Sequence, residues 1–164
     1  MAATDRICFT AEKTLGRLAK WLRLLGFDTL YASGIEQSVT DTAKCRDAGT
    51  DRILLTRTRK VWAAGLETPI IFIRADDPLE QVRQVVKTLN LTQSDIAPFS
   101  RCLRCNRQVR SLNRSHARGR VPDYIWTTHE LFSICDGCRK IFWPGSHTRR
   151  AAAIINKLFH DDSP

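Results

Sequence analysis

The chain has 164 residues, of which 43% are hydrophobic, and this suits one domain or a domain with a small module attached. No apolar run approaches the roughly 18 residues that a membrane helix needs, and no apolar segment of a signal peptide follows the first residues. These features exclude a membrane-spanning protein and predict a cytoplasmic one with reduced cysteines.

The net charge of +9 is concentrated in the second part of the chain. Residues 1–97 carry 14 Lys and Arg against 12 Asp and Glu, whereas residues 98–164 carry 12 against 5. A basic excess of this size is typical of proteins that bind a polyanion, most simply nucleic acid. The alternative is that the arginines serve solubility and neutralise a zinc ion held by four thiolates.

Short apolar strands alternate with amphipathic helices over the first 97 residues. The runs of apolar residues predict strands at 7–10, 29–31, 52–56 and 69–73. The apolar spacing predicts helices at 15–25, 60–64 and 78–89, and residues 33–51 are typical of a loop with a short helix. Gly26 is a fitting stop for the first helix, and Asp77 is either an N-cap or a metal ligand. The alternation predicts an α/β layer with a parallel sheet.

Two cysteine pairs dominate the second part of the chain. Cys102 and Cys105 form one C-x-x-C pair, and Cys135 and Cys138 form another after 29 intervening residues. Two such pairs are the usual ligand set of one tetrahedral ion, most often zinc. Gly137 lies in the second turn, where a positive φ is often needed. Two disulfides or a redox-active pair are the alternatives, and the expected reducing compartment favours the metal.

The segment from Pro98 to Pro122 contains seven arginines and no acidic residue. They are Arg101, Arg104, Arg107, Arg110, Arg114, Arg118 and Arg120. Because the segment is rich in polar residues, we expect them to be exposed and available for bidentate contacts with phosphate. On the polar face of the first helix, Lys13, Arg17 and Lys20 would add to an RNA-binding surface. His147 is a further candidate for contact with RNA.

Four stretches carry a resemblance to a known family. They are Leu15-Gly-Arg-Leu-Ala-Lys-Trp-Leu-Arg-Leu-Leu-Gly-Phe-Asp28, Arg52-Ile-Leu-Leu-Thr-Arg57, Arg101-Cys-x-x-Cys-Asn106 and Cys135-x-x-Cys-x-Lys-Ile-Phe-Trp-x-Gly-Ser-His147. They resemble the Mut-seven C-terminal RNase domain family, a PIN-like nuclease group. The resemblance implies a three-layer α/β/α domain over residues 1–97 and a zinc ribbon over 98–147. A C-terminal helix and tail would follow over 148–164.

The acidic site expected from this resemblance departs from the family pattern. Glu12 stands where the family usually has aspartate after the first strand, and Thr58 stands where aspartate usually follows Leu-Thr-Arg. The next carboxylate is Asp41 or Glu36, and placing Ala48 on the alanine of the family pattern favours Asp41. Asp76 follows the fourth strand and is a third candidate. Carboxylates at the ends of parallel strands converge on one crevice, where they would hold Mg²⁺ or Mn²⁺.

These observations predict a metal-dependent endoribonuclease with a structural zinc ion. Its catalysis would be weak, because a threonine hydroxyl cannot supply the charge of a carboxylate to a metal ion. One alternative is an RNA-binding protein that keeps the nuclease fold without cleaving. Another is a module whose zinc ribbon docks on other proteins. The natural RNA and any protein partner are not indicated by the sequence.

Overall fold

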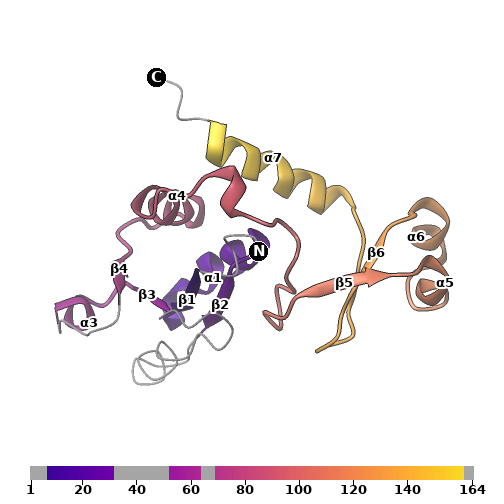
Figure 1. The fold of residues 1–164 in the computed structure, drawn as a ribbon, viewed down its shortest axis with the longest axis horizontal. Helices are drawn as coiled ribbons and strands as arrows, with labels where there is room; N and C mark the ends of the chain where they lie inside the picture. Colours follow the sequence, from indigo (N-terminus) through magenta and orange to yellow (C-terminus); the bar gives the residue numbers. More distant parts are fainter. Residues whose placement is uncertain (1–6, 32–51, 64–68, 161–164) are drawn as a thin grey trace. The chain divides into compact units, whose positions relative to one another are not determined.

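A computed structural model describes residues 7–31, 52–63 and 69–160. The chain divides into two compact units, Met1–Phe99 and Ser100–Pro164, and each is built on its own sheet (Figure 1). Glu36 and Asp41, together with the loop and helix expected at 33–51, lie outside the described residues.

The first unit contains a four-stranded parallel sheet with the order β2-β1-β3-β4. Its strands are β1 (Cys8–Ala11), β2 (Asp28–Tyr31), β3 (Ile53–Thr56) and β4 (Ile70–Phe72). The predicted α/β architecture is confirmed, and each strand lies within one residue of its expected bounds. Because the strands are parallel, the residues that follow them meet at one side of the sheet, which we call the carboxyl edge.

Five helices complete the described part of the first unit. They are the 3₁₀ helix η2 (Lys13–Leu15), α1 (Gly16–Leu24), α3 (Arg59–Ala63), α4 (Pro78–Thr88) and the 3₁₀ helix η3 (Gln93–Asp95). α1 packs on β1, β2 and α4, and Gly26 follows its end with a φ of 102°, as predicted. The Asp77 side chain accepts hydrogen bonds from the backbone N–H groups of Leu79 and Glu80, so Asp77 is the N-cap of α4.

A buried ion pair joins three strands of the parallel sheet. Arg52, only 4% exposed, lies with Nη1 2.7 Å from Oδ1 of Asp28 and donates a hydrogen bond to the carbonyl of Phe9. Asp28 begins β2, Phe9 belongs to β1, and Arg52 directly precedes β3. One guanidinium therefore holds the strands in register, and these bonds offset the cost of burying its charge.

The second unit contains a three-stranded antiparallel sheet with the order β5-β6-β7. Its elements are β5 (Val109–Leu112), α5 (Arg114–Ala117), α6 (Asp123–Thr128), β6 (Phe132–Cys135), β7 (Ile141–Phe142) and α7 (Ser146–His160). Figure 1 shows α5 and α6 at the same end of the β5–β6 pair. The unit has a small apolar core made of Leu112, Ala117, Val121, Ile125, Phe132, Ile134 and Ile141.

The last helix, α7, begins two residues before the helix and tail expected over 148–164, and it ends at His160. Among the residues that the structure describes, no helix combines the length and the apolar content that crossing a lipid bilayer requires.

Candidate functional site

The four paired cysteines gather into one cluster in the second unit. Their sulfur atoms all lie within 4.8 Å of one another, and Sγ of Cys102 is 3.7 Å from Sγ of Cys138. A tetrahedral zinc ion with bonds of about 2.3 Å separates its sulfurs by about 3.8 Å, so the cluster fits this ion. A disulfide bond of about 2.05 Å would be much shorter. All four cysteines are free thiols, which excludes the disulfide alternative.

Each cysteine pair lies in a tight turn that ends on a residue with positive φ. Asn106 follows the first pair with a φ of 61°, and Arg139 follows the second with a φ of 59°. The backbone N–H of each donates a hydrogen bond to the carbonyl of the first cysteine of its pair, Cys102 or Cys135, at 2.9 and 2.8 Å. The two turns therefore present their thiols in the same way, as one tetrahedral site requires.

Gly137 does not provide the positive φ that was predicted for the second cysteine turn. Its φ is not positive, so the prediction is wrong, and Arg139 takes the left-handed conformation of this turn instead. A Cβ atom on Gly137 would lie 2.8 Å from Cδ of Arg107. The Arg107 side chain thus crosses the second cysteine turn at close range, and a larger residue at position 137 would displace it.

The thiols of the cluster differ in acidity. A hydrogen bond from the backbone N–H of Lys140 lowers the pKa of Cys138 to about 7. The neighbouring Cys138 thiol raises the pKa of Cys105 to about 12, and burial raises that of Cys102. Cys138 is therefore more readily ionised than Cys102 or Cys105, and metal binding would displace the protons of those two thiols.

Glu12 occupies the carboxyl edge of the parallel sheet and is only 6% exposed. Its Oε1 accepts hydrogen bonds from the Thr14 hydroxyl at 2.6 Å and the Arg57 backbone N–H at 2.9 Å. Its Oε2 accepts from the Thr56 hydroxyl at 2.6 Å and the Thr58 hydroxyl at 3.1 Å. A carboxylate offers about four lone-pair positions, so these four donors use all of them.

The four donors also decide the charge of Glu12. Burial alone would raise the pKa of Glu12, but the hydrogen bonds from Thr14, Thr56, Arg57 and Thr58 outweigh it and hold the pKa below its ordinary value. Glu12 is therefore an ionised carboxylate at neutral pH.

Asp76 also lies at the carboxyl edge but has a charged partner. Its carboxylate pairs with the guanidinium of Arg57, and its side chain is 89% exposed. Asp76 and Arg57 line a cavity of about 520 Å³ that extends along α1. Thr14 lines the same cavity, so two of the residues that hold Glu12 also face it.

The cavity is strongly cationic, and only part of its lining was predicted from the sequence. Arg17 and Lys20 line it, whereas the predicted Lys13 does not. Arg23, Arg57 and Tyr31 also line it and were not predicted. Arg23 lies one helical turn after Lys20 on the same face of α1, a spacing from which it could have been found. Arg57 and Tyr31 are brought in by the sheet.

The predicted arginines of the second unit have different surroundings. Arg110 makes an exposed ion pair with Asp136 at 2.9 Å, and Arg101 donates a hydrogen bond to the carbonyl of Asn106. Arg104, Arg107 and His147 are exposed, as expected.

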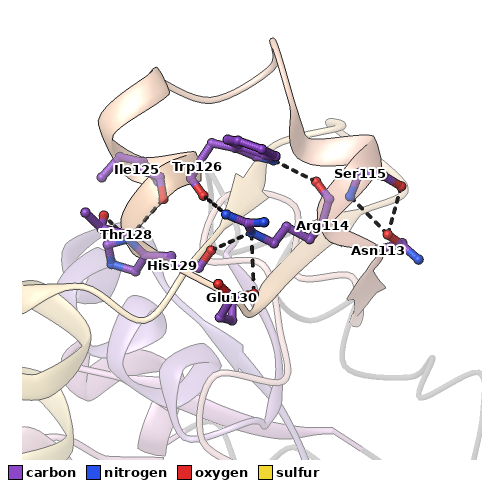
Figure 2. A network of polar contacts seen from close by, with 8 residues as sticks. All are labelled: Asn113, Arg114, Ser115, Ile125, Trp126, Thr128, His129 and Glu130. Atoms are coloured by element: carbon purple, nitrogen blue, oxygen red, sulfur yellow. Dashed lines mark hydrogen bonds and ion pairs between the residues drawn. The ribbon is translucent and has the colours of Figure 1, made fainter.

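Arg101 and Arg114 are half-buried, so the prediction of exposure is wrong for these two arginines. Arg114 joins α5 to α6 (Figure 2). Its Nη2 donates to the carbonyl of Trp126 at 2.8 Å, and its Nε donates to the carbonyl of His129 at 3.3 Å. Its guanidinium lies 4.2 Å from the centre of the Trp126 ring, and the indole N–H donates back to the carbonyl of Arg114. An ion pair with Glu130 completes the set. The guanidinium is thus engaged within the unit.

We expect Arg114→Ala to destabilise the second unit by about 2–3 kcal/mol, because it removes two hydrogen bonds to carbonyls and a cation–π contact. Urea unfolding of the zinc-loaded protein measures this change. The matched control is Arg110→Ala, which removes an exposed ion pair and should cost less than about 1 kcal/mol. Equal effects of the two changes would show that Arg114 is not a structural residue.

A search against models of protein families matches residues 7–155 to the model described as Mut7-C RNAse domain. The match includes both units, the residues around Glu12 and all four clustered cysteines. The chain belongs to the Mut7-C RNase domain family. No match was found among curated proteins or among solved structures.

Membership in the Mut7-C family bears on the function of the chain. It indicates a nuclease or other RNA-related function, and it implies interaction with RNA. The Mut7-C resemblance also makes Thr58 informative. Its hydroxyl donates to Oε2 of Glu12 at 3.1 Å, at the position where the resemblance leads us to expect a second carboxylate.

Proposed function

We propose that this chain is a slow metal-dependent endoribonuclease whose site lies at the carboxyl edge of the first unit. One observation carries the proposal: the buried, ionised Glu12 is held by Thr14 and Arg57, and both of these residues line the cationic cavity. A carboxylate that can bind a metal cation therefore lies next to the cationic side chains that can bind phosphates. Cleavage of a phosphodiester needs both.

The described residues supply only part of a site for Mg²⁺ or Mn²⁺. Oxygen ligands suit these ions, and Glu12 is a suitable carboxylate. Asp76 is already paired with Arg57, and no cluster of three acidic residues occurs within the described ranges 7–31, 52–63 and 69–160. We therefore propose Asp41, from outside these ranges, as the second ligand. A bound ion would orient water and offset charge on the phosphate.

The protein's own residues would hold the RNA. Arg17 and Lys20 would contact phosphates at the cavity of the first unit. Arg104, Arg107 and His147 are separate candidates for phosphate contact within the second unit. Phosphate contacts of this kind give affinity and position but little sequence readout. We therefore expect cleavage with weak base preference.

Binding of RNA without cleavage is the second candidate function. It is favoured by the four hydrogen bonds that use all lone-pair positions of Glu12, since a metal ion would have to displace at least one of them. It is also favoured by Thr58, which offers no charge to a second ion.

Thr58→Asp distinguishes the two functions. The Thr58 hydroxyl lies 3.1 Å from Oε2 of Glu12, so the change places a second carboxylate beside the first. We expect it to increase Mn²⁺-dependent cleavage about tenfold, because the paired charges bind the ion more tightly. The measurement uses one labelled RNA of mixed sequence, with Mn²⁺ or with a chelator.

Thr58→Asn is the matched control, because it changes the shape of the side chain in the same way without adding charge. It should not increase cleavage. If neither the wild type nor Thr58→Asp cleaves in Mn²⁺, while both bind the RNA in chelator, the chain is an RNA-binding protein on a nuclease fold.

A further inference from the structure

The cavity along α1 has a charge that suits one kind of phosphate better than another. Its lining carries four cations, Arg17, Lys20, Arg23 and Arg57, against the single carboxylate of Asp76. A phosphate within an RNA strand is a diester with one negative charge. A phosphate at the end of a strand is a monoester with nearly two negative charges at neutral pH, because its second pKa is about 6. The attraction to the cavity is correspondingly greater for the terminal phosphate.

Arg17 and Lys20 differ from the other two cations of the cavity. Among the residues that the structure describes, no carboxylate pairs with Arg17 or Lys20, and both are exposed toward solvent. They lie one turn apart on α1, so their side chains approach the cavity from the same side. Arg23, on the next turn, is anchored by a hydrogen bond from its Nε to the carbonyl of Thr29.

Arg57 is held at the cavity by a partner that a phosphate can replace. Its ion pair with Asp76 is exposed, and exposed ion pairs contribute little free energy in water. An arginine guanidinium binds phosphate through two parallel hydrogen bonds. A terminal phosphate would therefore compete effectively with Asp76 for Arg57.

One wall of the cavity is aromatic. The Tyr31 hydroxyl donates to the carbonyl of Lys13 at 2.8 Å, and the Tyr31 ring lies over Gly16, where a Cβ atom would be 3.3 Å from Cε2. The ring is thus fixed in place and yet 48% exposed. Exposed aromatic rings of this kind stack with the bases of single-stranded RNA. The cavity volume of about 520 Å³ is typical of pockets that hold a small ligand such as a nucleotide.

We infer that this cavity binds the terminal nucleotide of an RNA strand through its phosphomonoester, with the base against Tyr31. The inference rests on the proposed function for the choice of RNA as the ligand. It adds that the protein selects strand ends that carry a phosphate. The same chemistry occurs at a 5′ end, at a 3′ end and in a free nucleoside monophosphate, and the experiment separates the three.

The test measures binding of one labelled RNA sequence in chelator, so that cleavage does not interfere. Three forms are compared: with a 5′ phosphate, with a 3′ phosphate, and with hydroxyl groups at both ends. We expect one phosphorylated form to bind about tenfold more tightly than the hydroxyl form, as for hydrogen bonds to a charged group. A nucleoside monophosphate should compete with that form, and only at concentrations far above those of the RNA.

Variants show whether the preference comes from this cavity. Arg17→Ala with Lys20→Ala should abolish the preference for the phosphorylated end, and Asp76→Asn should strengthen it. Lys87→Ala, at the far end of α4, removes the same kind of charge elsewhere in the first unit and should leave the preference unchanged.

Equal binding of the three RNAs would overturn the inference while leaving the proposed RNA function standing. A preference that survives in the Arg17 and Lys20 double variant would overturn it as well, because the phosphate would then be recognised elsewhere. Competition by the free monophosphate as strong as by the RNA end would show that the ligand is a nucleotide and not a strand. If the wild type binds none of the three RNAs, the proposed function is overturned instead.

Discussion

Cys135→Ser is expected to release the metal ion from the second unit and to unfold that unit. Cys135 is completely buried at the end of β6, and its sulfur belongs to the cluster of four. Structural zinc contributes about 10–16 kcal/mol to the folding of small domains, which equals or exceeds the whole stability of a typical domain. Within the part of the chain that the structure describes, the apolar core of this unit has seven buried members, so it is too small to replace that contribution.

Two measurements check this expectation. Elemental analysis should find about one zinc ion per chain in the wild type and much less in Cys135→Ser. Amide hydrogen exchange should show lost protection in the second unit and retained protection in the parallel sheet of the first. Leu103→Ala is the matched control, because Leu103 lies inside the first cysteine turn without offering a ligand. A Cys135→Ser protein with normal protection in the second unit would show that metal is not needed for its fold.

Glu12→Gln is expected to abolish cleavage and to destabilise the first unit. The new amide keeps one acceptor oxygen, but its NH2 group would face two of the four groups that now donate to Glu12, either those of Thr14 and Arg57 or those of Thr56 and Thr58. Leaving such buried donors without an acceptor costs about 3 kcal/mol. Cleavage should fall more than about 100-fold, since loss of even the outer residues of a metal site costs about 10–100-fold.

The pH dependence of stability gives a second measurement of Glu12. Its pKa in the folded state lies below the ordinary value of 4.5, so the ionised form stabilises the fold at any pH above that value. This contribution is lost as the pH falls from 4.5 through the lower folded pKa. Urea unfolding at a series of acidic pH values should show this loss in the wild type, and Glu12→Gln should lack this part of it.

Glu80→Gln is the control for both measurements. Glu80 is an exposed carboxylate on α4, and replacing it should change neither cleavage nor acid stability appreciably. If Glu12→Gln cleaves as well as the wild type, the carboxyl edge is not the site of cleavage.

Much of the fold was predictable because its signals are local. The apolar runs that form β1 to β4 are short and bounded by polar residues, so periodicity and composition identified them to within one residue. Asp77 and Pro78 marked the start of α4 because capping depends on neighbours in the sequence. The two C-x-x-C pairs identified the metal cluster, since four thiols in two tight turns have few other uses.

The tertiary structure alone decided how the site residues are used. Nothing local in the sequence shows that Thr56 and Thr58 donate to Glu12, because parallel pairing of β1 with β3 brings them together across more than 40 positions. In the sequence, nothing distinguishes Arg114 from the neighbouring arginines that are exposed. Only the folding of α6 against it shows that its guanidinium is engaged within the unit. The sequence by itself thus determined which elements form and which cysteines gather into a cluster that could hold a metal. Contacts between distant segments decided which charged side chains are paired inside the fold. They also decided which charged side chains stay available for the proposed contacts with RNA.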